Sequence, residues 1–150
     1  MGKLHIKLIT PERTVLEEEV ASLTCPTTDG QITILPGHAA LVATLETGEL
    51  IARNKDEEHF IHVAGGFIEI RSSGEIIILA DSAEHFFEID IARAEEAKKE
   101  AEKILQSEHI ANEEYVMASL ALRKNLSRIR IARKHSHRRT RVTSEGVLEQ

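Results

Sequence analysis

Short runs near the start of the chain place a hydrophobic residue at every second position. Leu4, Ile6 and Leu8 alternate with polar residues, and the same period returns over residues 32–34. This period is typical of β-strands with one buried face. Turn-forming residues separate the runs at the spacing of short antiparallel strands, and they lie at 10–13, 26–30, 36–38, 47–48, 54–58, 65–66 and 72–74. The pattern predicts an antiparallel β-sandwich, or flattened barrel, over residues 1–86.

The hydrophobic period changes to that of a helix in the second part of the chain. Residues 89–145 contain neither Gly nor Pro, so nothing in their composition interrupts a helix. Ala94, Ala97 and Ala101 recur at steps of three and four, followed by a hydrophobic pair at the next turn. We therefore predict a first helix over residues 90–107.

A polar break over residues 107–112 precedes a second stretch with a helical period. Its hydrophobic positions are Ala118, Leu122, Leu126, Ile129 and Ala132. Asn112 suits the N-cap of this helix, and Glu113 and Glu114 suit the positive end of its dipole. The two stretches predict an antiparallel two-helix hairpin over residues 87–134, and with the sandwich they give an α+β fold.

The predicted contact face of the hairpin consists largely of alanine. Alanine buries little area, and each buried CH₂ contributes only about 0.8 kcal/mol. We therefore expect the two helices to separate at small cost. Beyond Lys134 the chain is basic and polar and has no hydrophobic period, which predicts a short disordered basic tail over residues 135–150.

Composition indicates the class of protein and the compartment in which it is found. Hydrophobic residues make up 41% of the chain and charged residues 29%, as in globular proteins. The longest apolar runs, such as Ile76–Ala80, have five residues, against the ~20 that a membrane-spanning helix needs. The single Cys25 cannot form an internal disulfide, which is typical of a reducing compartment. The first residues lack the apolar segment of a signal peptide, so we expect no export.

Charge is distributed unevenly. Residues 1–88 hold six Lys and Arg against fifteen Asp and Glu, a net charge of −9, whereas residues 89–150 hold thirteen against ten, a net charge of +3. The stretch Arg123–Arg141 carries nine basic residues and no acidic one. This stretch favours an anionic partner. A nucleic-acid-binding or adaptor module acting through it is one reading, although the net charge of −6 and the lack of nearby aromatic residues argue against nucleic acid.

Candidate catalytic chemistry is sparse. The sequence contains no GxSxG, Walker loop or HExxH motif. His38 follows a Pro-Gly turn, which favours a loop contact over catalysis. His59 and His62 are three residues apart in a predicted strand, so they point to opposite faces and do not share a metal. We expect no enzymatic activity of the chain alone, no metal site and no required cofactor.

Four segments together carry a family resemblance: Asp29–Ala39, Ala64–Ile70, Leu79–Glu84 and Ile89–Ala94. In this order and spacing they resemble the epsilon subunits of bacterial and chloroplast F-type ATP synthases, over about residues 3–133. The sequence departs from the family pattern in having Gln31 where the family usually has an acidic residue and Ala40 where it usually has proline.

The resemblance implies that the sandwich is a non-catalytic part of the rotor. In this family it sits at the foot of the central stalk of a proton-translocating synthase and binds the gamma subunit and the c-ring. The residues that match the contact loop are Gln31, Ile32, Pro36 and His38. The resemblance further implies a peripheral protein at the cytoplasmic face of the cell membrane, held there only through the complex, with no nucleic acid as partner.

For the hairpin, the resemblance implies regulation. In the family it either folds down or opens toward acidic helices of the catalytic beta subunits, flanked by the alpha subunits, and inhibits ATP hydrolysis. The residues expected to meet the beta subunit are Arg123, Lys124, Arg128, Arg130 and Arg133.

Some family members also bind regulatory ATP in the folded-down state. The matching positions are Ile89, Asp90, Arg93 and Ala94, with Glu84 upstream and Arg128, or less securely Lys124, on the second helix. The two arginines suit phosphate oxygens, and the carboxylates suit adenine or ribose. Asp90 is equally a natural N-cap of the first predicted helix, so the match alone does not separate a ligand role from a structural one.

Overall fold

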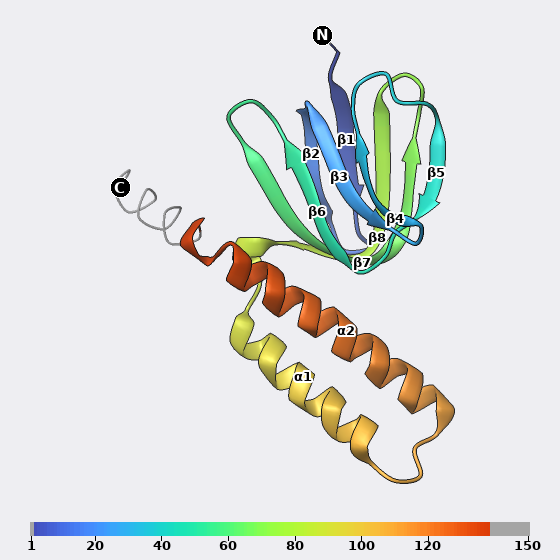
Figure 1. The fold of residues 1–150 in the computed structure, drawn as a ribbon, viewed down its shortest axis with the longest axis vertical. Coiled ribbons are helices and arrows are strands. Elements are labelled where there is room, and N and C mark those ends of the chain that lie inside the picture. Colours follow the sequence, from blue (N-terminus) through green and yellow to red (C-terminus); the bar gives the residue numbers. More distant parts are fainter. Residues whose placement is uncertain (1, 139–150) are drawn as a thin grey trace. The chain divides into compact units, whose positions relative to one another are not determined.

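The computed structural model describes residues 2–138 (Figure 1). Contacts divide the chain into two units, Met1–His85 and Phe86–Gln150. The first unit is built of strands, and the second contains a short 3-10 helix, η1 (Phe86–Glu88), and two long helices. The α+β class predicted from the two hydrophobic periods is therefore confirmed.

The strands of the first unit are β1 (Leu4–Ile9), β2 (Thr14–Val20), β3 (Ser22–Thr27), β4 (Gly30–Ile34), β5 (Leu41–Thr44), β6 (Gly48–Arg53), β7 (Glu58–Ile70) and β8 (Glu75–His85). Their order in the sheet is β2-β1-β8-β7-β6-β3-β4, and β5 also pairs with β7. Every pair is antiparallel except β1 with β8, which is parallel. The predicted antiparallel sandwich is confirmed, with the one parallel pair as an addition that the sequence did not reveal; no hairpin turn joins the first strand to the last.

Strand β7 belongs to both layers of the sandwich. Its first half pairs with β6 and its second half with β5, while β8 follows it along both halves. Gly65 and Gly66 lie between the two halves, with φ of 72° and 118°. A Cβ at Gly66 would overlap the carbonyl oxygen of Leu79, so only glycine permits this approach of β8. The predicted break at residues 65–66 is therefore wrong, because the glycines bend the strand without ending it.

The sandwich core is aliphatic. Alternate residues of β1 face it, as the period of two predicted, and so do alternate residues of β7 and β8. Its fully buried members include Leu4, Ile6, Leu8, Leu23, Ile34, Leu50, Ile61, Ile68, Ile70, Ile76 and Ile78. Cys25 is buried among them, and the loss of solvation raises the pKa of its thiol to about 12. The thiol is therefore a small apolar side chain at neutral pH and not a reactive group.

The second unit is the predicted helical hairpin, with α1 (Ile91–Gln106) packed on α2 (Asn112–Lys134). Ala94 and Ala101 of α1 and Ala118 of α2 are buried, which confirms the alanine-rich contact face. Leu126 was predicted to lie on this face, but 45% of it is exposed, and Asn125 is buried in its place. The Asn125 Nδ2 donates to the Ala121 carbonyl at 2.8 Å, so its burial leaves the amide satisfied.

The predicted N-cap is confirmed for α1 and is wrong for α2. Asp90 caps α1, and its carboxylate accepts a hydrogen bond from the backbone N–H of Arg93 at 3.2 Å. Asn112 does not cap α2, because Ala111 has the extended cap conformation and accepts from the Tyr115 N–H, so the helix begins one residue earlier than predicted. Within the described residues, no helix is both long and apolar enough to cross a membrane.

Helical structure extends past the predicted end of the hairpin at residue 134. His135 is buried, and its ring lies 5.4 Å from that of Phe86 in η1. Residues 136–138 continue in a helical turn. The rest of the predicted disordered tail, residues 139–150, lies outside the described residues.

Candidate interaction surfaces

The residues predicted to meet the c-ring lie together on an edge of the sandwich. Gln31 and Ile32 belong to β4, the last strand of the sheet order, and Pro36 and His38 lie in the turn that follows. Gln31 and Pro36 are exposed, and Ile32 and His38 are half-buried. The His38 N–H donates to the Leu35 carbonyl at 3.1 Å, which fixes the turn. The four residues thus lie in one segment at this edge, but Ile32 packs against the sandwich core and is less available to a partner than Gln31 and Pro36.

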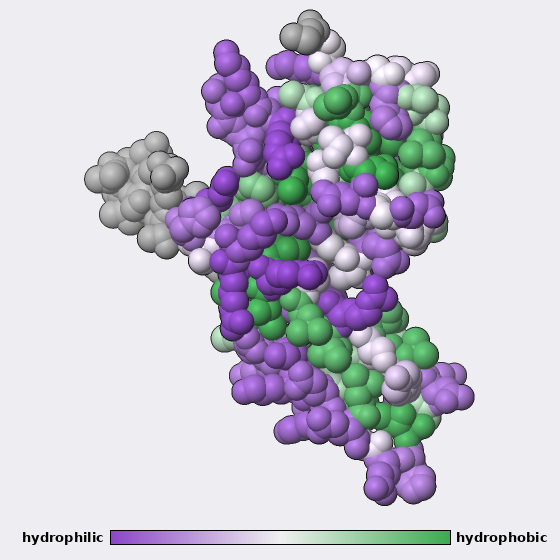
Figure 2. Space-filling model, in the orientation of Figure 1, coloured by the Kyte–Doolittle hydropathy of each residue, from purple (hydrophilic) through white to green (hydrophobic). Residues whose placement is uncertain are grey.

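A second surface of the sandwich is apolar and was missed by the sequence reasoning. Val42 on β5, Phe67 on β7 and Leu79 on β8 are 70%, 58% and 53% exposed. Phe67 pairs directly with Leu79 and with Thr44, two residues from Val42, so all three side chains share one face of the sheet. We call these three residues the outer apolar patch. Figure 2 shows hydrophobic residues gathered on the sandwich around β5.

A signal for this patch was present in the sequence. The run Ile76–Ala80 is apolar at every position, so β8 offers apolar side chains to both of its faces. A strand in a sandwich with one solvated face would alternate instead. Adjacent exposed apolar side chains of this kind mark an interaction site more often than isolated ones do.

The predicted basic contact residues of α2 divide into two groups. Arg123, Arg130 and Arg133 are exposed and lie within one side of the helix, whereas Lys124 and Arg128 are half-buried on another. The Arg133 guanidinium donates to the Glu95 carboxylate of α1 at 2.7 Å and so joins the two helices. The last basic residues of the predicted stretch, Arg139 and Arg141, lie outside the described residues.

The hairpin also exposes hydrophobic side chains at the start of α2. Val116 is 54% exposed, Met117 68% and Leu120 54%. Figure 2 shows hydrophobic residues following α2 along the hairpin. The helix thus has apolar as well as basic surface that its partner helix does not cover.

The residues predicted to bind ATP do not all belong to one unit. Glu84 is half-buried on β8 of the first unit, and the others belong to the second. Ile89 is buried, Asp90 is occupied as the cap of α1, and Ala94 is buried in the hairpin. Arg93 is exposed on the first turn of α1. The sixth residue, Arg128, donates to the Asn125 side-chain oxygen at 2.9 Å.

Both units correspond to described protein families. Residues 3–86 match the beta-sandwich domain of the ATP synthase delta/epsilon chain, and residues 88–133 match the long alpha-helix domain of the same chain. The chain belongs to the ATP synthase delta/epsilon chain family. The predicted resemblance is therefore confirmed at the level of the family.

Curated relatives in this family match over nearly their whole length. The ATP synthase epsilon chain of Dehalococcoides mccartyi is 41% identical over 134 residues, covering 89% of this chain and 95% of the relative. The ATP synthase epsilon chain of Chloroflexus aggregans is 41% identical over 137 residues, covering 91% and 96%.

The fold of the family recurs in solved structures. A chain in the cryo-EM structure of the Euglena gracilis mitochondrial ATP synthase, comprising OSCP, F1 and the c-ring, superposes with a TM-score of 0.75 at 24% identity, covering 85% of this chain and 79% of that one. At this identity the likeness concerns the fold.

Proposed function

We propose that this chain is a non-catalytic epsilon subunit of an F-type, proton-translocating ATP synthase, where it turns with the central stalk and couples the catalytic head to the c-ring. The observation that carries the proposal is the consecutive match of both domains in one chain, at residues 3–86 and 88–133. Relatives that it covers almost completely are named ATP synthase epsilon chain. As part of that complex, it is peripheral to the membrane on the cytoplasmic face.

The sandwich supplies the rotor contacts in this proposal. The β4 edge and its turn, with Gln31, Ile32, Pro36 and His38, meet the c-ring. The outer apolar patch meets the gamma subunit. Its three large side chains are exposed in the isolated chain, and their burial against a partner gives a favourable contribution of about 25 cal/mol for each Å² removed from water.

The hairpin supplies regulation by opening and inhibiting ATP hydrolysis. Its buried face is built largely of alanine, so separation of the helices exposes little apolar surface. Opening breaks the Arg133–Glu95 ion pair and releases Arg133 to join Arg123 and Arg130. These basic residues, with Lys124 and Arg128, then meet acidic helices of the catalytic beta subunits, with the alpha subunits as neighbours.

Regulatory ATP would stabilise the closed hairpin. Arg93 and Arg128 suit phosphate oxygens, with Glu84, Ile89, Asp90 and Ala94 completing the matched positions. Because Asp90 already caps α1, its carboxylate has a structural role that is independent of any ligand. ATP shifts the hairpin toward the closed state only by as much as it binds that state more tightly.

The test of rotor function is assembly with a gamma subunit from the same genome, followed by ATPase assays of the catalytic head. We expect the full chain to bind gamma and inhibit, and a chain truncated after Glu88 to bind gamma without inhibiting. Phe67→Asp should abolish gamma binding, whereas Met117→Asp, at an apolar position on α2 that is more exposed than Phe67, should retain it. Failure of the full chain to bind gamma would overturn the rotor proposal.

The proposed inhibition of ATP hydrolysis by the hairpin is tested by charge reversal in the full chain. Arg123→Glu combined with Arg130→Glu should relieve inhibition to the level of the truncated chain while gamma binding persists. Lys103→Glu makes the same kind of charge change at an exposed position of α1 and should leave inhibition intact. Equal inhibition by the unaltered chain, the Arg123→Glu and Arg130→Glu double variant and Lys103→Glu would exclude the basic side of α2 as the contact with the beta subunit.

A further inference from the structure

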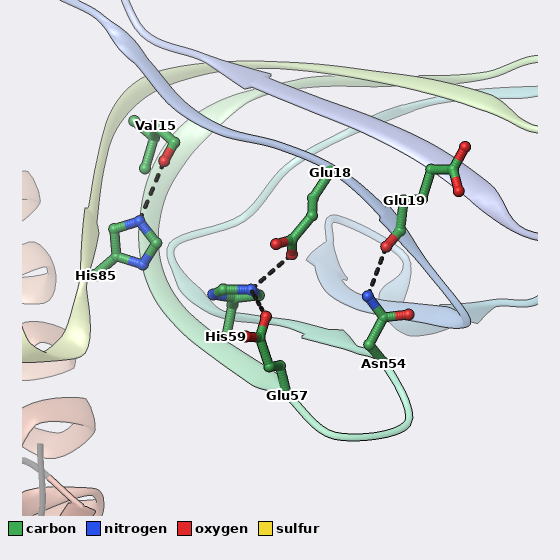
Figure 3. A network of polar contacts seen from close by, with 7 residues as sticks. All are labelled: Val15, Glu18, Glu19, Asn54, Glu57, His59 and His85. Carbon is green, nitrogen blue, oxygen red and sulfur yellow. Dashed lines mark hydrogen bonds and ion pairs between the residues drawn. The ribbon is translucent and has the colours of Figure 1, made fainter. Parts of the chain in front are cut away.

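Three side chains from two segments that are distant in the sequence meet beside β2 of the sandwich. Glu18 lies on β2, His59 near the start of β7, and Glu57 in the turn between β6 and β7. The His59 Nε2 lies 2.7 Å from a Glu18 carboxylate oxygen and 3.7 Å from one of Glu57. Figure 3 shows both carboxylates directed at the same ring nitrogen. One ligand atom from each residue falls within a group no more than 4.8 Å apart.

The backbone holds these three residues in place. The Asn54 Nδ2 donates to the Glu19 carbonyl of β2 at 2.6 Å, and the Asn54 N–H donates to the Glu57 carbonyl at 2.8 Å (Figure 3 shows the first of these). The turn that carries Glu57 is thus attached to the strand that carries Glu18. A site supported in this way loses little conformational freedom when it takes up a ligand.

The His59 ring is also oriented by a neighbour. The ring of His85 lies edge-on to it with centroids 6.1 Å apart, and the His85 Nε2 lies 3.1 Å from the Val15 carbonyl oxygen. Figure 3 shows His85 directed at Val15 and not at the two carboxylates. Its ring therefore packs beside His59 without adding a ligand atom to the group.

Two of the three ligand atoms are shielded from water. The Glu18 Oε2 and the His59 Nε2 are both solvent-inaccessible, and at 2.7 Å a proton between them closes an ion pair. A metal ion would take the place of that proton, because the carboxylate oxygen and the neutral imidazole nitrogen each offer a lone pair to a cation. Glu57 is on the solvent side, with 66% of its side chain exposed, which leaves an entry path.

The ligand set and spacing suit zinc. Zn²⁺ binds imidazole nitrogen and carboxylate oxygen at about 2.0 to 2.2 Å, so neighbouring tetrahedral ligands lie roughly 3.4 Å apart. The 3.7 Å contact is already close to this spacing, and the 2.7 Å contact reaches it by a small rotation of Glu18. One imidazole favours zinc over magnesium or calcium, and two carboxylates balance its charge.

We propose that Glu18, Glu57 and His59 form a binding site for a divalent transition-metal cation, with Zn²⁺ as the favoured ion and water in the fourth position. The bound ion connects β2 to the β6–β7 turn and so cross-links strands that are not neighbours in the sheet order. The site lies within the sandwich and needs no other subunit, so its test is independent of the proposed rotor function.

The test is calorimetric titration of the full chain with zinc chloride, together with thermal unfolding. We expect one zinc ion per chain and a rise in Tm on its addition. Glu57→Gln changes an exposed turn residue and leaves the fold intact, and it should weaken binding on the order of 10- to 100-fold, as even second-shell changes do at zinc sites. His59→Gln should weaken binding at least as much and remove the rise in Tm.

A matched control is available on β1. His5 also lies against a glutamate, with its Nε2 3.1 Å from Glu19, but the pair is exposed and the described residues place no second carboxylate in a ligand group with it. His5→Gln should therefore bind zinc as the unaltered chain does. Zinc binding that survives both Glu57→Gln and His59→Gln would overturn the site, as would the absence of any zinc-induced change in the unaltered chain. Either outcome would leave the cluster as an ion pair only.

Discussion

The two units of this chain differ in how much apolar surface each of them buries in its own interior. Of the twelve largest fully buried side chains, eleven belong to the sandwich and one, Ile89, to the second unit. Among the described residues, the buried positions of α1 and α2 are four Ala, two Ile, Asn125 and Ser127. The sandwich is therefore suited to be a stable platform, whereas the hairpin is suited to come apart. This difference is the one that the proposed function requires of a sandwich that binds the stalk and a hairpin that opens.

The largest predicted effect lies in the sandwich core. Ile78→Ala removes a fully buried side chain, and we expect the free energy of unfolding to fall by about 2 to 5 kcal/mol. Leu79→Ala, at the next position and 53% exposed, should change it by no more than about 0.5 kcal/mol. Urea unfolding of both variants measures the contrast. Equal losses would show that the two faces of β8 are not as different as the burial indicates.

The glycine bend should be nearly as sensitive. Gly66→Ala adds a Cβ that overlaps the Leu79 carbonyl oxygen at a φ of 118°, and we expect a loss on the order of 1 to 3 kcal/mol or more. Gly30→Ala also places alanine at positive φ, but nothing lies within 4 Å of the added Cβ. Its smaller loss isolates the cost of backbone strain from the cost of the clash. Both are measured by thermal or urea unfolding.

In the hairpin, the cap of α1 should give an intermediate effect. Asp90→Ala removes the side-chain acceptor of the Arg93 N–H and should cost about 1 kcal/mol, seen as faster hydrogen exchange in the first turn of α1. Asp90→Asn keeps a cap of similar strength and should restore protection. If Asp90→Asn still lowers ATP affinity, the carboxylate has a ligand role beyond the cap. If ATP binding is unchanged, the cap accounts for Asp90 entirely.

The smallest effect is expected from the ion pair between the helices. Arg133 and Glu95 have side chains 64% and 30% exposed, so a double-mutant cycle with Arg133→Gln and Glu95→Gln should give a coupling of only about 0.2 to 1 kcal/mol. The coupling should decline as salt is added. A coupling well above this range would mean that the closed hairpin is held by electrostatics more than by its alanine face.

Local pattern was sufficient for much of this architecture. The change of hydrophobic period separated the strands from the helices, and Ala94 and Ala101 were correctly placed on the contact face. Asp90 was correctly placed as a cap. Leu126 was placed wrongly because one residue is a rotation of about 100° on a helix, and small errors of phase move a side chain from a buried face to an exposed one.

The candidate surfaces also divide into those that the sequence alone revealed and those that it did not. The β4 edge and the basic side of α2 are continuous in the sequence, so a motif or a charge run reveals them. The outer apolar patch draws on β5, β7 and β8, and the Glu18, Glu57 and His59 cluster draws on two strands and a turn. Neither group is visible in a linear pattern, because strand pairing assembles the patch and the closure of the sandwich brings β2 to the β6–β7 turn.

By itself, the sequence determined where this protein forms strands and helices and which faces of them are apolar, because periodicity and capping depend on neighbouring residues. Only the tertiary structure decided that β1 lies parallel to β8 and that β7 passes through Gly65 and Gly66 into both layers. These features depend on contacts between distant segments, whose free energy is set by the assembled core and not by local preference.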